Sequence, residues 1–159
     1  MRIGLISDTH DRLPTLNAAL TLFQHLGVQT LLHPGDIVAP FAAKPLAAFP
    51  GTLYVTYGNN DGERAGLKKV LPQIQDGPLH VTLANRRILL HHFRDWCQPA
   101  DIERADIIVT GHTHEVTIQR EGDKLFVNPG ECCGWVNGRC TVAILDLVTE
   151  HVEILEIPE

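Results

Sequence analysis

The chain has 159 residues, of which 44% are hydrophobic and 20% charged, and this predicts one globular domain spanning residues 1–159. Its formal net charge is −6 without a run of Lys or Arg, so we expect it not to bind duplex nucleic acid, which requires clustered cations. No apolar run approaches the roughly 20 residues of a membrane span, and Asp8 and His10 follow the first run too closely for a signal peptide. These features predict a cytoplasmic protein that does not bind membranes.

Short apolar runs alternate with helix-like stretches in the first half of the chain. RIGLIS, TLLH and LYVTYG are predicted strands, and PTLNAALTLFQHLG and PFAAKPLAAF between them are predicted helices. Pro14 near the start and Gly27 near the end of the first helix follow the usual asymmetry of helix termini. Its apolar residues recur at helical spacing and are expected to pack on a sheet: Leu16, Ala19, Leu20, Phe23 and Leu26. This alternation is typical of an α/β sheet with parallel connections.

The second half of the chain reads mainly as strands. These are HVTLANRRILLHH, DIIVTGHTH, VTIQREGDKLFVN and TVAILDLVTEHVEILEI, with hairpin turns expected at residues 84–86, 121–123 and 149–151 and one helix near residues 98–105. The predicted architecture is therefore α/β, with two sheets flanked by helices. The edge segments VTIQREG and HVEILEI offer a route to a homo-oligomer by strand pairing, and nothing selects one of them.

The four cysteines contain no C-x2-C pair of the kind that signals a structural zinc site. They are Cys97, Cys132, Cys133 and Cys140, and we expect free thiols in a reducing compartment. We interpret the adjacent Cys132 and Cys133 as small buried residues of a tight loop, with oxidation or binding of a soft metal as the alternative.

Polar side chains follow five of the apolar runs. In an open α/β sheet, ligands bind beyond the carboxyl ends of the strands. Each residue taken singly has an ordinary explanation as a helix cap, a turn residue or a surface histidine. Together they are harder to dismiss, because clustered carboxylates and imidazoles without a cation leave unpaired polar groups at a heavy desolvation cost. The set is Asp8, His10, Asp36, Asn59, His91, His92, His112 and His114.

The chemistry of these side chains predicts a metal centre. Carboxylate, amide oxygen and imidazole ligands without a thiolate suit Mn, Fe, Zn, Ni or Co and disfavour Cu(I); we take Mn²⁺ as the first choice. The candidates exceed what one ion uses when a substrate position stays open. We therefore predict two divalent metal ions per chain, bridged by Asp36, with His112 and His114 facing different ions.

The motifs together resemble the calcineurin-like metallophosphoesterase superfamily, and most of all its small bacterial and archaeal phosphodiesterase branch. They run in the family's order from Ser7 to Glu131 and cover essentially the whole chain: S-D-T-H, H-P-G-D, G-N-N-D, a strand-end His91, G-H-T-H and N-P-G-E. The resemblance implies a fold of two packed mixed β-sheets with helices outside.

The resemblance also implies a ligand set. One metal would be held by Asp8, His10, Asp36 and His114, and the second by Asp36, Asn59, His91 and His112. The NH2 group of Asn59 would in addition contact a substrate phosphate. The implied activity is hydrolysis of a small phosphodiester by in-line attack of a hydroxide that bridges the two metals.

This chain departs from the family pattern at two places. Asn60 occupies the position of a histidine that assists the leaving group in many larger members, and loss of a general acid typically costs about 10²–10⁴ in rate. Small relatives usually carry H-G-H at the fourth motif, where this chain has His91-His92-Phe93, so Phe93 replaces the second histidine. Whether His92 compensates is open, because neighbouring side chains of a strand point to opposite faces.

Two features of the sequence concern the substrate. Arg12, Arg64 and Arg94 lie near motif loops and are candidates for binding substrate phosphate, with solvated surface charge as the alternative. Met and aromatic residues are too few to predict a nucleobase-stacking surface. One alternative function is a non-catalytic, metal-binding interaction scaffold of the same fold, as in the eukaryotic retromer subunit. Another is a nuclease, which is disfavoured because the chain shows no extra DNA-binding domain.

Overall fold

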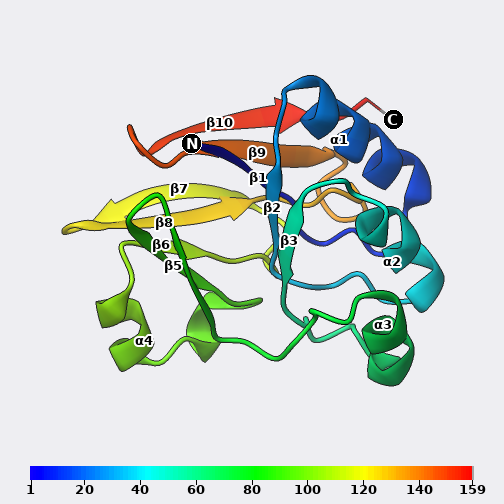
Figure 1. Ribbon diagram of the computed structural model, residues 1–159, viewed down its shortest axis with the longest axis horizontal. Coiled ribbons are helices and arrows are strands. Elements are labelled where there is room, and N and C mark those ends of the chain that lie inside the picture. Colours follow the sequence, from blue (N-terminus) through cyan, green and yellow to red (C-terminus); the bar gives the residue numbers. More distant parts are fainter. Residues whose placement is uncertain (159) are drawn as a thin grey trace.

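Two five-stranded mixed sheets form the centre of the fold in the computed structural model, which describes residues 1–158 (Figure 1). The first sheet has the order β10-β9-β1-β2-β3. Its strands are β1 (Arg2–Leu5), β2 (Thr30–His33), β3 (Thr52–Val55), β9 (Thr141–Asp146) and β10 (His151–Glu156). β1, β2 and β3 are parallel, and β9 runs antiparallel to both β1 and β10.

The second sheet has the order β4-β5-β6-β8-β7. Its strands are β4 (Leu79–Leu83), β5 (Arg86–Leu90), β6 (Ile107–Val109), β7 (Val116–Glu121) and β8 (Lys124–Pro129). The three central strands β5, β6 and β8 are parallel. The predicted hairpins join β4 to β5, β7 to β8 and β9 to β10, and the segments proposed for oligomerisation contain the edge strands β7 and β10.

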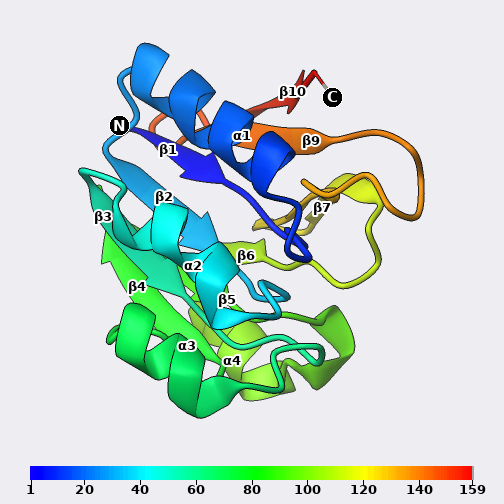
Figure 2. The same cartoon turned by 90° about the vertical axis from the view of Figure 1, so that its right-hand side faces the viewer.

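The helices cover the two outer faces of this double sheet. α1 (Leu13–His25) and α2 (Pro40–Ala47) lie in front of the first sheet in Figure 2, and α3 (Arg64–Val70) lies below α2 and adds Leu67 to the same apolar layer. The short 3-10 turn Arg94–Trp96 and α4 (Pro99–Arg104) connect β5 to β6, and α4 lies on the side of the second sheet (Figure 1). The predicted architecture of two packed sheets flanked by helices is therefore confirmed.

Side-chain alternation along the strands builds three separate apolar layers. Ile88 and Leu90 of β5 belong to the core between the sheets, whereas Leu89 points outward to the cluster that packs with Ile102 of α4. This is the two-residue period of a strand buried on both faces. On the other side, Phe23 of α1 is fully buried in the layer above the first sheet.

Two details of the helices differ from the sequence prediction. Leu26 was expected to pack on the sheet, but it follows the last residue of α1 and is 37% exposed. α3 was not predicted, because Leu67 is its one buried residue and gives the sequence no apolar period. Within residues 1–158, no helix combines the length and apolar character required to cross a membrane.

The loops after the parallel strands of both sheets meet at one edge of the molecule. Backbone hydrogen bonds join the loop after β1 to the loop after β2, from Asp8 N–H to the Gly35 carbonyl, and to the loop after β8, from Cys133 N–H to the Asp8 carbonyl. The loop after β6 is tied to the end of β5 by the bond from Gly111 N–H to the His92 carbonyl. The fold thereby gathers the predicted site residues at this edge.

Candidate metal centre

Five of the predicted ligands stand in left-handed backbone conformation. Positive φ angles are uncommon outside glycine and persist where the surrounding structure enforces them, often at functional sites. The hydrogen bonds between the loops supply that enforcement here. The residues and their φ angles are Asp8 (51°), His10 (37°), Asp36 (61°), His112 (68°) and His114 (62°).

The first group of side chains surrounds Asp8. Asp8 Oδ1 lies 3.5 Å from His114 Nε2 and 3.8 Å from His10 Nε2, and His10 Nε2 lies 3.4 Å from Asp36 Oδ2. Within residues 1–158, the buried atoms Asp8 Oδ1 and His10 Nε2 have no hydrogen-bond partner. Burial disfavours a charged imidazole, but the carboxylates of Asp8 and Asp36 outweigh it and raise the pKa of His10. Orphaned acceptors around two buried carboxylates fit a bound cation.

Hydrogen bonds to Oδ2 of Asp8 hold the carboxylate in place, and Oδ1 is thereby directed toward His10 and His114. Asp8 Oδ2 accepts hydrogen bonds from Ser7 Oγ and from the His112 N–H. A side chain at Gly111 would collide with both Ser7 Oγ and Asp8 Oδ2. The glycine of the G-H-T-H motif is therefore required for the close approach of the two loops.

The second group of side chains surrounds Asn59. Asn59 Oδ1 lies 2.8 Å from His92 Nε2 and 2.8 Å from His112 Nδ1, and these two nitrogens are 3.3 Å apart. His92 Nε2 is also 3.4 Å from Asp36 Oδ2. One oxygen of Asp36 therefore faces a histidine of each group, His10 and His92.

At the end of β5, His92 rather than His91 reaches this second group. Consecutive side chains leaving a strand point in opposite directions. The His91 ring instead packs edge-on against Trp96, and its Nδ1 accepts the His92 N–H. His92 is fully buried, with Nδ1 hydrogen-bonded to the Pro34 carbonyl. If His92 takes the place of the first histidine of the H-G-H pattern, Phe93 stands at its glycine and Arg94 at its second histidine.

Asp36 is held as a carboxylate by its neighbours. Burial favours its neutral form, but His92 and the two donors of Asn60 outweigh burial and keep the pKa of Asp36 well below its usual range. Asn60 donates its backbone N–H to Asp36 Oδ1 and its Nδ2–H to Asp36 Oδ2, both at 2.8 Å. Asn60 thus supports Asp36 and carries no titratable proton of its own.

Asp61, the last residue of G-N-N-D, was not singled out by the sequence and organises the loops beneath Asp36. It is 2% exposed and accepts four backbone N–H groups, from Asp36, Ile37, Val38 and Gly58, at 2.7–2.9 Å. A carboxylate that bonds to successive backbone N–H groups fixes a turn much as an N-cap does. The loops after β2 and β3 therefore share one anchor.

Glu131 of N-P-G-E fixes the orientation of His114. Glu131 Oε2 accepts the His114 Nδ1–H at 2.7 Å, and Glu131 Oε1 accepts the backbone N–H groups of Val136 and Asn137. Burial opposes ionisation, but His114 and these backbone donors outweigh it and lower the pKa of Glu131. A carboxylate behind an imidazole is the usual support of a metal-binding histidine, and it leaves His114 Nε2 directed at Asp8.

The three candidate arginines are all engaged with other protein groups. Arg12 donates to the Cys133 carbonyl at 2.6 Å, and its guanidinium lies 4.8 Å from the Trp135 ring centre. Arg64 is paired with Asp76 at 2.7 Å. Arg94 makes a two-point contact with Glu121 at 2.7 and 2.8 Å. The structure therefore gives each arginine a structural partner, and binding of a substrate phosphate would require these contacts to change.

Aromatic rings border the second group more closely than the composition suggested. The Phe93 ring centre lies 4.2 Å from that of His112, and Trp96, 43% exposed, lies 6.3 Å from His112. Few aromatic residues are present in the chain, but two of them are concentrated at this edge.

The fold and the clustered side chains define a metal-dependent phosphoesterase architecture, and comparison with known proteins agrees. Residues 1–150 match the calcineurin-like phosphoesterase superfamily domain, so the chain belongs to the calcineurin-like phosphoesterase superfamily.

Similar proteins include small archaeal and bacterial phosphodiesterases. The chain is 38% identical to phosphodiesterase MJ0936 of Methanocaldococcus jannaschii over 99% of this chain and 98% of that protein. It is 29% identical to phosphodiesterase YfcE of Escherichia coli K12 over 82% of this chain and 78% of that protein. The solved structure of an archaeal phosphodiesterase superposes with a TM-score of 0.87 at 33% identity, covering 99% of this chain and 100% of that one.

Proposed function

We propose that this protein is a metal-dependent phosphodiesterase that acts on a small phosphodiester with two divalent metal ions. The observation that carries the proposal is the convergence of two buried carboxylates, an amide and four imidazoles at one edge, where Asp8 Oδ1 and His10 Nε2 have no hydrogen-bond partner within residues 1–158. The family membership and the phosphodiesterase relatives support the same activity.

The proposed ligands fall into two sets that share Asp36. Asp8, His10, Asp36 and His114 would hold one ion, and Asp36, Asn59, His92 and His112 would hold the other. His92 replaces His91 in this assignment because His92 is the histidine that approaches Asp36 and Asn59. Mn²⁺ is the first choice of metal, with Fe, Zn, Ni and Co as alternatives.

The chain's own residues then have distinct roles. When bound, a pair of divalent ions supplies a water-derived nucleophile near neutral pH and neutralises charge on the phosphoryl group. Asn59 Oδ1 faces His92 and His112, which leaves its NH2 group to donate to a phosphate oxygen. Glu131 keeps Nε2 of His114 directed at Asp8, and Asp61 keeps Asp36 and the Gly58 turn in register.

The identity of residue 60 bears on which esters react. Asn60 donates two hydrogen bonds to Asp36 and has no proton to give to a leaving group. The chain therefore offers no general acid at this position, and we expect esters of acidic alcohols, such as aryl diesters, to react faster than alkyl esters.

The four cysteines of residues 1–158 are free thiols, which supports a reducing compartment such as the cytoplasm.

The test is hydrolysis of an aryl phosphodiester and the matching monoester by protein stripped with a chelator and reloaded with Mn²⁺. We expect activity only after reloading, with the diester preferred. Asp36→Ala or His112→Ala should abolish the metal-dependent turnover while circular dichroism remains unchanged. Turnover by the stripped protein at the reloaded rate would refute the metal assignment. Two metals bound without any turnover would instead favour the non-catalytic scaffold.

A further inference from the structure

The adjacent cysteines of the G-E-C-C-G loop face different parts of the molecule. Cys132 is buried in the apolar layer that packs α1 on the first sheet, where burial raises the pKa of its thiol to about 12. Cys133 is equally buried but lies at the metal centre. The packing interpretation made from the sequence thus describes Cys132 and leaves Cys133 to be explained.

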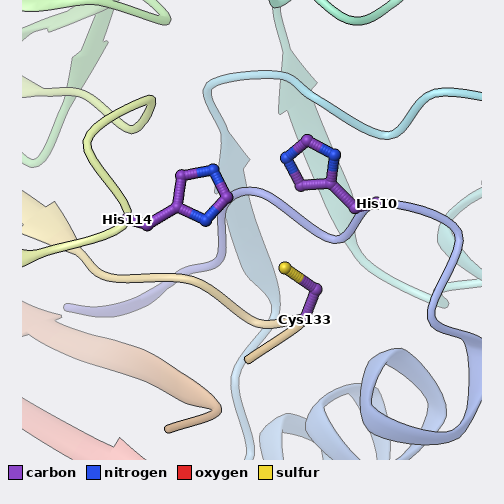
Figure 3. Close-up of side chains that lie close together, drawn as sticks. All are labelled: His10, His114 and Cys133. Atoms are coloured by element: carbon purple, nitrogen blue, oxygen red, sulfur yellow. The ribbon is translucent and has the colours of Figure 1, made fainter. Parts of the chain in front are cut away.

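Cys133 lies close to two proposed metal-binding histidines. One ligand atom from each of Cys133, His10 and His114 falls within 4.8 Å of the others. Figure 3 shows the three side chains converging from the loops after β8, β1 and β6, with the sulfur directed between the two rings. Cys133 Sγ also donates to Glu131 Oε2 at 3.2 Å, the oxygen that accepts the His114 Nδ1–H.

A second feature of this place points independently to a cation. Asp8 is 0% exposed, its Oδ1 has no hydrogen-bond partner within residues 1–158, and this oxygen is directed at His10 and His114. A buried carboxylate oxygen left unpaired is costly unless a cation satisfies it. The thiol lies close to the two imidazoles, and the same two imidazoles face the unpaired oxygen.

We infer that Cys133 supplies a thiolate to the metal position formed by Asp8, His10 and His114, so that this position takes a thiophilic divalent ion, Zn²⁺, Co²⁺ or Cd²⁺, in preference to Mn²⁺. The inference rests on the proposed function, because it concerns one of the two proposed metal positions, and it replaces Mn²⁺ as the first choice of metal for that position alone. It also makes the two positions chemically unequal, since the position of Asn59, His92 and His112 has only nitrogen and oxygen ligands.

Glu131 is placed to accept the proton that the Cys133 thiol loses when it binds a metal ion. Coordination breaks the S–H bond, forms a metal–sulfur bond and releases one proton, and Glu131 Oε2 already accepts that hydrogen. With Zn–S near 2.3 Å and Zn–N near 2.0–2.1 Å, neighbouring ligand atoms of one ion lie roughly 3–3.5 Å apart, so the thiol and the rings need to move inward by about 1–2 Å.

The experiment is a Co²⁺ titration of the chelator-stripped protein, followed by absorption spectroscopy. A cobalt–thiolate bond gives a near-ultraviolet charge-transfer band, whereas nitrogen and oxygen ligands give only the weaker visible bands. We expect the charge-transfer band in the unmodified protein and in Cys132→Ala, the matched control, and its loss in Cys133→Ala and Cys133→Ser. Circular dichroism checks that each variant is folded.

A competition measurement gives the second readout. Cys133→Ala should lower the affinity for Cd²⁺ relative to Mn²⁺ by at least about tenfold, since even the loss of an outer partner of a metal ligand costs about 10–100-fold. Co²⁺ binding with visible bands alone, or a charge-transfer band that survives in Cys133→Ser, would overturn the inference and leave the proposed function intact. Failure to bind Co²⁺ at all would overturn both.

Discussion

Replacing Asp61 with asparagine should destabilise the protein more than any other single-atom change at the metal centre. The carboxylate accepts two backbone N–H groups on each oxygen: Ile37 and Val38 on Oδ1, and Asp36 and Gly58 on Oδ2. An amide retains one acceptor oxygen and turns its NH2 group toward the other pair of donors. At least two hydrogen bonds are lost, because the asparagine NH2 group faces two buried backbone N–H groups, which are then left without an acceptor.

The magnitude follows from the charge of the acceptor. Hydrogen bonds to charged groups contribute about 1.5–3 kcal/mol each, so the loss of two costs about 3–6 kcal/mol. A domain of this size has a total free energy of unfolding of about 5–15 kcal/mol. The Asp61→Asn variant is therefore expected to lie close to its folding limit in the absence of metal.

Urea denaturation of the metal-free protein, followed by circular dichroism, measures this loss. The matched control is Asp76→Asn, which removes an exposed ion pair with Arg64 and should change the free energy of unfolding by less than about 0.5 kcal/mol. Metal affinity of Asp61→Asn should fall as well, because Asp36 loses its anchor. A destabilisation below about 1 kcal/mol would refute the reasoning, since it would mean that the four bonds do not hold the loops.

Three further predictions concern the histidines. His92→Ala should reduce the metal content from two ions per chain to one by elemental analysis, whereas His91→Ala should keep both; the reverse result would restore the original assignment of His91. Glu131→Gln should weaken metal binding by about 10–100-fold, as the loss of an oriented imidazole partner does elsewhere; unchanged affinity in calorimetry would contradict its role. Burial lowers the pKa of His33 to about 4, below the value of about 6.5 for an unfolded chain. The unfolded state therefore binds the extra proton between pH 6.5 and 4, and stability falls as the pH drops through this window, by up to about 3 kcal/mol. His33→Asn should show a shallower loss than the unmodified metal-free protein in denaturation at several pH values, and an equal slope would exclude His33 as the cause.

The strand pattern and the motif order of the sequence were sufficient to predict the fold and the edge at which the site residues meet. Asp8, Asp36 and Asn59 lie in the loops after β1, β2 and β3, and these loops meet because parallel strands present their carboxyl ends together. α3 escaped prediction because a seven-residue helix with one buried leucine has no measurable period. The single-domain prediction for residues 1–159 stays a prediction.

The choice between neighbouring residues was beyond the sequence. His91 and His92 are chemically identical, and their roles depend on which face of β5 each leaves at the strand's end. The same holds for Cys132 and Cys133, of which one packs in the core and the other approaches His10 and His114. Asp61 was not singled out, because three of its four bonds come from residues 36–38, which are adjacent to it only in the folded chain.

The left-handed conformation at five proposed ligands bears on how such a protein changes over time. Each of these positions imposes backbone strain of the order of 1 kcal/mol on a side chain with a Cβ, and glycine would relieve that strain. A substitution of glycine for Asp8 or His112 would therefore remove a proposed metal ligand. The same substitution would relieve backbone strain, which offsets part of the stability lost with the side chain. Catalysis and architecture are thus separable in this chain: a descendant can lose its enzymatic activity in one step and still present the same folded surface to a partner.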